Sequence, residues 1–266
     1  MTLRARRTTI ICLLSITILI FIAGAAIVLY LSASGVDNQV SGLAAIRTVF
    51  TENDGLFFIL LLSGINIATL VVIFRYFRRS SIPEVFLAMV AVSTFAMEAI
   101  AAGIPLLHEL RQPLMYFEFL ARTTVFFQLA GMLGLFFVSL FMMGIHYQKV
   151  SNILLIQIII ALLFAYALPV RTTSGFTLLT HSISGGHTYA GLLGGIVLLA
   201  YVNLIGSYLQ QKESEGWMTH IGCGLLLTGR LLTIILEGHN RYAGLVLITT
   251  GLILFSKEQY QRYLWN

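Results

Sequence analysis

The stretch from residue 219 to 237 holds the side chains in this sequence that could do chemistry. They are polar residues at helical spacing within an apolar run: His220, Cys223, Arg230 and Glu237. At about 100° per residue they fall within an arc of about 100°, so a helix would present them on one face. Arg230 lies near the middle of the run, where a charged residue costs roughly 2.5–3.5 kcal/mol on insertion scales. We therefore expect Arg230 to face the protein interior, either in a polar path or anion-binding site or in an ion pair that only fixes helix packing.

Glu98 is an acidic residue inside another apolar run, residues 83 to 105. An ionised carboxylate alone at membrane depth is costly, so Glu98 is expected to be protonated or paired. Arg230 and Arg122 are the available partners, and the small residues Ala96 and Ala99 would let a neighbouring helix approach closely. We predict that Glu98 contacts one of these arginines, either as a carboxylate that couples protons or ions or as half of a static salt bridge.

Glu118 and Arg122 form a second acid–base pair, near the start of the run from 120 to 145. A spacing of four with the acid first places both side chains on one face of a helix. Because both lie near the outer end of this run, they fit a solvated ion pair of little energetic value, or an extension of the polar site. Gln128, deeper in the run, is expected to make a hydrogen bond between helices.

Three histidines in loops or near the ends of apolar runs are the candidates for a metal site: His181, His187 and His239. Imidazole and carboxylate ligands suit zinc, and histidine pairs at the two membrane faces would suit two haems. The sequence has no HExxH motif, however, and we expect no cofactor, with metal or haem as the alternative. A cysteine nucleophile is disfavoured, because Cys223 and His239 would lie about 24 Å apart along one helix.

Long apolar runs are the elements that must position these side chains. Hydrophobic residues make up 58% of the chain and charged residues 10%, against roughly 25% charged residues in soluble domains. The runs cover residues 9 to 31, 55 to 75, 83 to 105, 120 to 145, 152 to 169, 187 to 209, 219 to 237 and 242 to 256. Such runs predict an all-α fold, a polytopic transmembrane helix bundle of about eight spans, or seven if the last run lies only partly in the bilayer. We expect a single integral membrane domain, 1–266, with no soluble domain.

The basic residues predict the orientation of the bundle. With the N-terminus in the cytoplasm, the cytoplasmic side holds Arg4, Arg6, Arg7, Arg75, Arg78, Arg79, Lys149, Lys212, Lys257 and Arg262. The outer side holds only Arg47, Arg111, Arg171 and Arg241. This excess follows the positive-inside rule and predicts cytoplasmic N- and C-termini. The net charge of +5 comes from these short clusters, so it does not indicate nucleic-acid binding, and the lack of a lysine deep in a run excludes a retinal protein.

Rows of small residues in the run from 187 to 209 indicate close helix packing. Gly186, Ala190 and Gly194 are spaced by four, as are Gly191 and Gly195. At such rows a neighbouring helix, or a second copy of the chain, packs tightly. Residues 176–192 also match residues 229–245 at eight of seventeen positions, although chance matches of this size are expected in a chain rich in Leu, Ala and Gly.

Two functions from different classes fit these features. The first is binding or translocation of a small solute or ion, in particular a small anion, at a polar cavity where runs 83–105, 120–145 and 219–237 meet. The second is a membrane scaffold or sensor subunit that acts through protein partners, since no catalytic motif is present. An intramembrane enzyme that depends on metal or haem is third, so an enzyme is the less expected class. The lack of an N-x-Ser/Thr acceptor favours a bacterial cytoplasmic (inner) membrane.

Overall fold

The computed structural model describes residues 3–34, 54–77, 82–144, 150–168, 186–210, 217–236 and 238–265. Regular secondary structure within these residues is helical, which confirms the all-α fold class. The α-helices are α1 (Leu3–Ser34), α3 (Asp54–Phe77), α4 (Pro83–Met97), α5 (Gly103–Glu109), α6 (Leu114–Met142), α7 (Val150–Ala167), α8 (Gly186–Gln210), α9 (Trp217–Ile235) and α10 (Arg241–Trp265). The 3-10 segments are η1 (Glu98–Ala102) and η2 (Gly238–Asn240).

Seven helical spans in the described part of the chain are long and apolar enough to cross a membrane. One of them, Pro83–Leu107, is made of α4, η1 and the start of α5. The eighth predicted run corresponds to α10, whose apolar part ends at Phe255 and is followed by Ser256, Lys257 and Glu258. The chain therefore has the helices of a multi-pass membrane protein. α10 is the shorter apolar run for which the sequence predicted either a full membrane span or a partial one.

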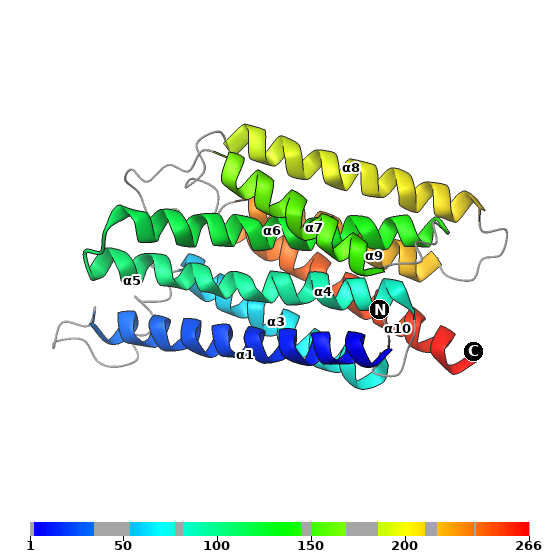
Figure 1. Cartoon of the computed structure of the whole chain (residues 1–266), viewed down its shortest axis with the longest axis horizontal. Coiled ribbons are helices and arrows are strands. Elements are labelled where there is room, and N and C mark those ends of the chain that lie inside the picture. The colour runs from blue at the N-terminus through cyan, green and yellow to red at the C-terminus, as the bar shows by residue number, and fades with distance from the viewer. Residues whose placement is uncertain are drawn as a thin grey trace.

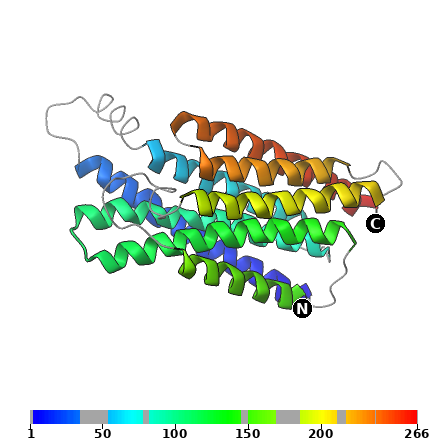
Figure 2. The ribbon, with the colours of Figure 1, turned by 90° about the horizontal axis from the view of Figure 1, so that it is seen from above.

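The helices lie alongside one another, roughly along the long axis of the molecule (Figure 1). Both views place the start of α1 and the end of α10 toward the same end of the bundle, with α5 toward the opposite end (Figures 1 and 2). An even number of crossings returns a chain to the side from which it began. The arrangement is thus compatible with both termini on one side of the membrane, and which side that is stays a prediction.

α4 is the central helix of the bundle. Every residue from Val85 to Met97 is buried, and α1, α3 and α6 pack against this helix. A helix that is apolar on all faces is expected at such a position. α1, α7 and α8 lie at the periphery and expose large apolar side chains such as Leu19, Leu163 and Leu198, as helices that face lipid do.

Glycines bring α9 and α10 into backbone contact. A Cβ added to Gly229 would lie 2.7 Å from the carbonyl oxygen of Gly244, and one added to Gly222 would lie 2.9 Å from that of Gly251. The spacing of seven repeats the contact after two helical turns. Because Gly229 pairs with Gly244 and Gly222 with Gly251, the two helices are antiparallel, and α10 holds α9 in position.

The glycine rows of α8 do not pack against the rest of the described chain. A Cβ at Gly191, Gly194 or Gly195 would meet nothing within 4 Å. α8 instead contacts α6 and α9 through another face, which includes the buried residues Tyr189 and Leu193. Of the two alternatives, packing of these glycines on another helix of the same chain is not seen among the described residues, and packing against a second copy stays a prediction. The suspected repeat lies partly outside the described residues, since it includes 176–185.

Candidate functional site

Glu98 and Arg230 form an ion pair in the interior of the bundle. Glu98 is the first residue of η1, Arg230 lies on α9, and Nη2 of the arginine donates to Oε1 of the glutamate. Only 1% of the Arg230 side chain and 4% of the Glu98 side chain are exposed. The predicted contact of Glu98 with an arginine is confirmed, and the partner is Arg230 rather than Arg122.

The ring of Phe95 supports the guanidinium group of Arg230. Cζ of Arg230 lies 4.4 Å from the centroid of this ring, a cation–π contact worth about 2 kcal/mol or more when it is desolvated. The ring also lies against Gly131 of α6, where any Cβ would overlap it. Because Phe95 precedes Glu98 by three residues, the same span supplies both the carboxylate and the aromatic face that hold Arg230.

Part of the Arg230 guanidinium group has no hydrogen-bond partner. Nε and Nη1 are both buried, and neither is bonded to any of the described residues. A guanidinium group has five N–H donors, and an unsatisfied buried donor costs about 1–3 kcal/mol, or more when it is charged. The site therefore retains donors that an oxyanion could satisfy.

The span that carries Glu98 stays helical but changes from α-helix to 3-10 helix at Glu98 itself. α4 ends at Met97, and five residues of 3-10 helix precede α5, which begins at Gly103. Pro105 accounts for the break, because it has no N–H to donate to the carbonyl of Ala101 and its ring would clash with that carbonyl. A stretch of 3-10 helix inside a longer helix often marks a hinge. The Gly103-Ile104-Pro105 segment was the signal for this break in the sequence.

Helices α1 and α3 come close to this break through small residues. Ser63 of α3 donates to the carbonyl oxygen of Ala96 at 2.6 Å. Gly24 of α1 lies so near that an added Cβ would be 3.2 Å from the carbonyl oxygen of Ala99. The expected close approach of other helices at these alanines is confirmed.

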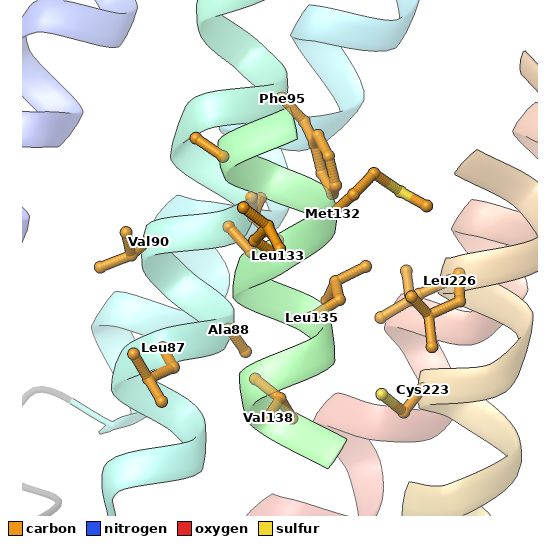
Figure 3. Close-up of a cluster of buried hydrophobic side chains, with 14 of the residues drawn as sticks. Leu87, Ala88, Val90, Phe95, Met132, Leu133, Leu135, Val138, Cys223 and Leu226 are labelled. Atoms are coloured by element: carbon orange, nitrogen blue, oxygen red, sulfur yellow. The ribbon is translucent and has the colours of Figure 1, made fainter. Parts of the chain in front are cut away.

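The polar face of α9 is buried, but its polar groups do not form a continuous path. His220, Cys223 and Arg230 are all buried, as their spacing predicted. Between His220 and Arg230, Cys223 and Leu226 lie opposite Leu135 and Val138 of α6 within the apolar core (Figure 3). Cys223 therefore belongs to the apolar core and does not connect His220 to Arg230. Glu237, the last residue of the predicted face, lies outside the described residues.

His220 joins α9 to α8 and, through Ser207, to α6. Its Nε2 lies 2.9 Å from Oγ of Ser207, which donates its own hydrogen to the carbonyl oxygen of Met142. Because Ser207 has only one hydrogen to donate, Nε2 of His220 must be the donor in their shared bond. His220 therefore does not accept a proton from Ser207 in this arrangement, which argues against a serine nucleophile here.

Glu118 and Arg122 form a separate ion pair nearer the surface. Nη2 of Arg122 lies 2.7 Å from Oε1 of Glu118, and their side chains are 20% and 45% exposed. Nη1 of Arg122 also donates to the carbonyl oxygens of Ala165 and Tyr166, at 3.1 and 2.7 Å. These carbonyls lie in the last turn of α7, where they have no partner within the helix. The two ion pairs share no hydrogen bond within the described residues, and Arg122 fixes the end of α7 against α6.

Replacing Arg122 by methionine is expected to lower the free energy of unfolding by about 1–2 kcal/mol, because the α7 carbonyls lose their donor. Glu118→Gln should cost less than about 1 kcal/mol, since it removes only an exposed ion pair. SDS-titration unfolding of the purified protein measures the loss of unfolding free energy in both variants. Equal losses in the two variants would show that the ion pair, rather than the carbonyl contacts, carries the stabilisation.

The histidines proposed for a metal site are only partly described. His239 is exposed on η2, with its ring 6.4 Å from that of Tyr242. His181 lies outside the described residues, as does the side chain of His187. Among the described residues, no three His, Cys, Asp or Glu side chains are grouped so that they could hold a metal ion. A metal or haem site therefore stays an untested alternative.

Several interhelical hydrogen bonds connect α6, α7, α8 and α9. Tyr189 of α8 donates to Oε1 of Gln128 at 2.7 Å, which confirms the interhelical bond expected for Gln128. Tyr201 contacts both Thr228 and the carbonyl of Gly224 on α9. Gln157 of α7 reaches the carbonyl of Ala130 at 2.6 Å. The last two contacts could not be predicted from the sequence, because a lone tyrosine or glutamine in an apolar run does not indicate its partner.

Comparison with known proteins does not assign this site. No protein-family model, no curated protein and no solved structure matches the chain.

Proposed function

We propose that this protein binds a small anionic solute at Arg230 and carries it across the membrane. The observation that supports this proposal is a buried guanidinium group with unsatisfied donors, paired with Glu98 at a break in the central span. Ionisable groups at membrane depth are costly and are typical of substrate and ion sites.

The closed surroundings of Arg230 favour a carrier over a channel. The polar cavity expected where runs 83–105, 120–145 and 219–237 meet is not found at Arg230: within the described part of the chain only 1% of this residue is exposed, and Cys223 and Leu226 on the same helix belong to the apolar core. A channel needs a continuous polar path, whereas a carrier opens its site to one side at a time. A closed arrangement is what a carrier adopts between its two open forms, and the break before Pro105 offers a place where the span can bend.

A scaffold or sensor subunit is the second candidate, favoured by the open glycine face of α8. Within the described part of the chain, a Cβ at Gly191, Gly194 or Gly195 would meet nothing within 4 Å, and small residues at this spacing let another helix approach. In that case the Glu98–Arg230 pair would be static, and a protein partner or a second copy would cover α8. The cytoplasmic membrane of a bacterium is the proposed location for either function.

Thermal melting of the detergent-purified protein tests the anion site. The screen contains chloride, nitrate, phosphate and acetate, and each anion is tested with the same series of cations. At a hundredfold excess over its dissociation constant, an anion that binds only the folded state stabilises it by about 2.7 kcal/mol. We expect at least one anion to raise the melting temperature of the wild type and to have no effect on Arg230→Gln.

Arg122→Gln is the matched control, because it removes an arginine from a neighbouring helix whose partners are Glu118 and α7. It should melt at a lower temperature than the wild type but keep the shift with the anion. If no anion shifts the wild type, or if Arg230→Gln keeps the shift, Arg230 is not the binding group and the scaffold function becomes the better candidate.

A further inference from the structure

The charge balance of the Glu98–Arg230 pair restricts what can bind beside it. One guanidinium group faces one carboxylate, so the pair is neutral as a unit. An anion added to Arg230 would put two negative charges against one positive charge in a place from which water is largely excluded. Acidic groups that share such a place do not both stay ionised, and one of them takes up a proton. A bound anion is therefore compatible with this site when Glu98 loses its charge.

We infer that the anionic solute replaces the Glu98 carboxylate on Arg230 and that Glu98 takes up one proton as it leaves. This inference rests on the proposed function. In the exchange, the hydrogen bond from Nη2 of Arg230 to Oε1 of Glu98 breaks, and the guanidinium group donates to an oxygen of the solute instead. A proton from the water on the open side adds to the carboxylate. One negative charge and one proton enter together, so the site stays neutral and the protein couples anion transport to proton transport in the same direction.

The donors of Arg230 fit an incoming oxyanion. Nη2 is the nitrogen that Glu98 would release, while Nε and Nη1 already lack hydrogen-bond partners within the described ranges. A planar or tetrahedral oxyanion can accept from two adjacent guanidinium nitrogens at once, as carboxylates and phosphates commonly do. Phe95 holds the guanidinium plane in place throughout, because its contact with Cζ does not depend on Glu98. The solute therefore gains more hydrogen bonds from Arg230 than the single one that Glu98 makes.

Among the side chains that the structure describes around Glu98, Arg230 is the cation that contacts its carboxylate. Of the elements that pack against η1, α1 and α3 present the uncharged residues Gly24 and Ser63 at the neighbouring backbone. The charged residues of α6, Glu118 and Arg122, are bonded to each other and to the end of α7. On α5 the titratable residues are His108 and Glu109, whose side chains lie outside those described.

Proton uptake on binding tests the exchange directly. Nitrate and acetate are added to the full-length protein in weakly buffered detergent solution, and the protons removed from solution are counted with a pH-sensitive dye. We expect about one proton per bound anion in the wild type. At pH values where Glu98 is ionised in the free protein, the dissociation constant of the anion should increase about tenfold for each unit by which the pH rises. Glu98→Gln carries no charge, as protonated glutamic acid does, so it should bind the same anions without proton uptake and without dependence on pH.

Glu118→Gln is the matched control, because it removes the carboxylate of the other ion pair and should leave the proton count unchanged. If Glu98→Gln does not fold, difference infrared spectroscopy of the wild type replaces it, and anion addition should produce the carbonyl band of a newly protonated carboxyl group. Anion binding by the wild type without proton uptake or without this band overturns the exchange while the anion site stands. Proton uptake that persists in folded Glu98→Gln also overturns it. Failure of every anion to bind the wild type overturns both proposals.

Discussion

Arg230→Met and Glu98→Leu will each destabilise the protein by about 3–5 kcal/mol, because each leaves one charge buried without its partner. The double variant will lose much less than the sum of the two, since an apolar pair of similar volume leaves no uncompensated charge. SDS-titration unfolding of the wild type, the two single variants and the double variant gives the coupling free energy. We expect a coupling of at least about 2 kcal/mol, within the range found for residues in direct contact.

The Glu118–Arg122 pair provides the control for this cycle within the same protein. It joins the same two residue types, but its side chains are 45% and 20% exposed, so its coupling should stay below about 1 kcal/mol. Additive effects of Glu98→Leu and Arg230→Met would contradict the buried pair. A double variant that is stable but no longer shifted by any anion would separate the role of Arg230 in binding from its role in stability.

Gly229→Ala and Gly222→Ala will each force α9 and α10 apart and lower the free energy of unfolding by about 1–3 kcal/mol, as overpacking of a core does. The new methyl groups would lie 2.7 Å from the carbonyl oxygen of Gly244 and 2.8 Å from the backbone nitrogen of Phe255, respectively. Backbone atoms cannot move aside as the end of a flexible side chain can. Because Arg230 follows Gly229, Gly229→Ala should also weaken any anion binding at Arg230.

Gly194→Ala and Gly195→Ala in α8 are the matched controls, since a Cβ at either position meets nothing within 4 Å. They should leave stability unchanged or raise it slightly, because alanine favours a helix by roughly 0.5–1 kcal/mol over glycine. Thermal melting in detergent compares the four variants. If Gly195→Ala is as destabilising as Gly229→Ala, then α8 is covered by a second copy in solution, which would favour the scaffold candidate.

The helical spans and the depth of Arg230 could be predicted from the sequence because they depend on local properties. A long apolar run can satisfy its backbone hydrogen bonds in lipid only as a helix, wherever its neighbours lie. A spacing of three and four places His220, Cys223 and Arg230 on one face whatever they contact. Likewise, a charge such as Glu98 at membrane depth needs a partner, and few opposite charges were available. The Glu118–Arg122 pair follows from spacing alone.

The packing of the glycines could not be predicted in the same way. The sequence predicted close packing at the glycine rows of α8, because small residues spaced by four often lie at helix contacts. In the described part of the chain, however, a Cβ at these glycines would meet nothing within 4 Å. The close contacts involve Gly222 and Gly229 with Gly251 and Gly244, at a spacing of seven. Which helix meets which depends on how all spans are arranged around α4, and spacing within one helix carries no information about that arrangement.

The sequence by itself determined that this protein is a helical membrane bundle and that Glu98 and Arg230 are buried charges in need of partners. Only the tertiary structure decided that they pair with each other, because 132 residues separate them and Arg122 was an equal candidate. The tertiary structure also decided that Arg122 instead fixes the end of α7, and that Cys223, which lies between His220 and Arg230 on α9, is part of the apolar core. The physical reason is that desolvation and helix propensity act residue by residue, whereas the choice of partner depends on which helices come into contact once the bundle has assembled.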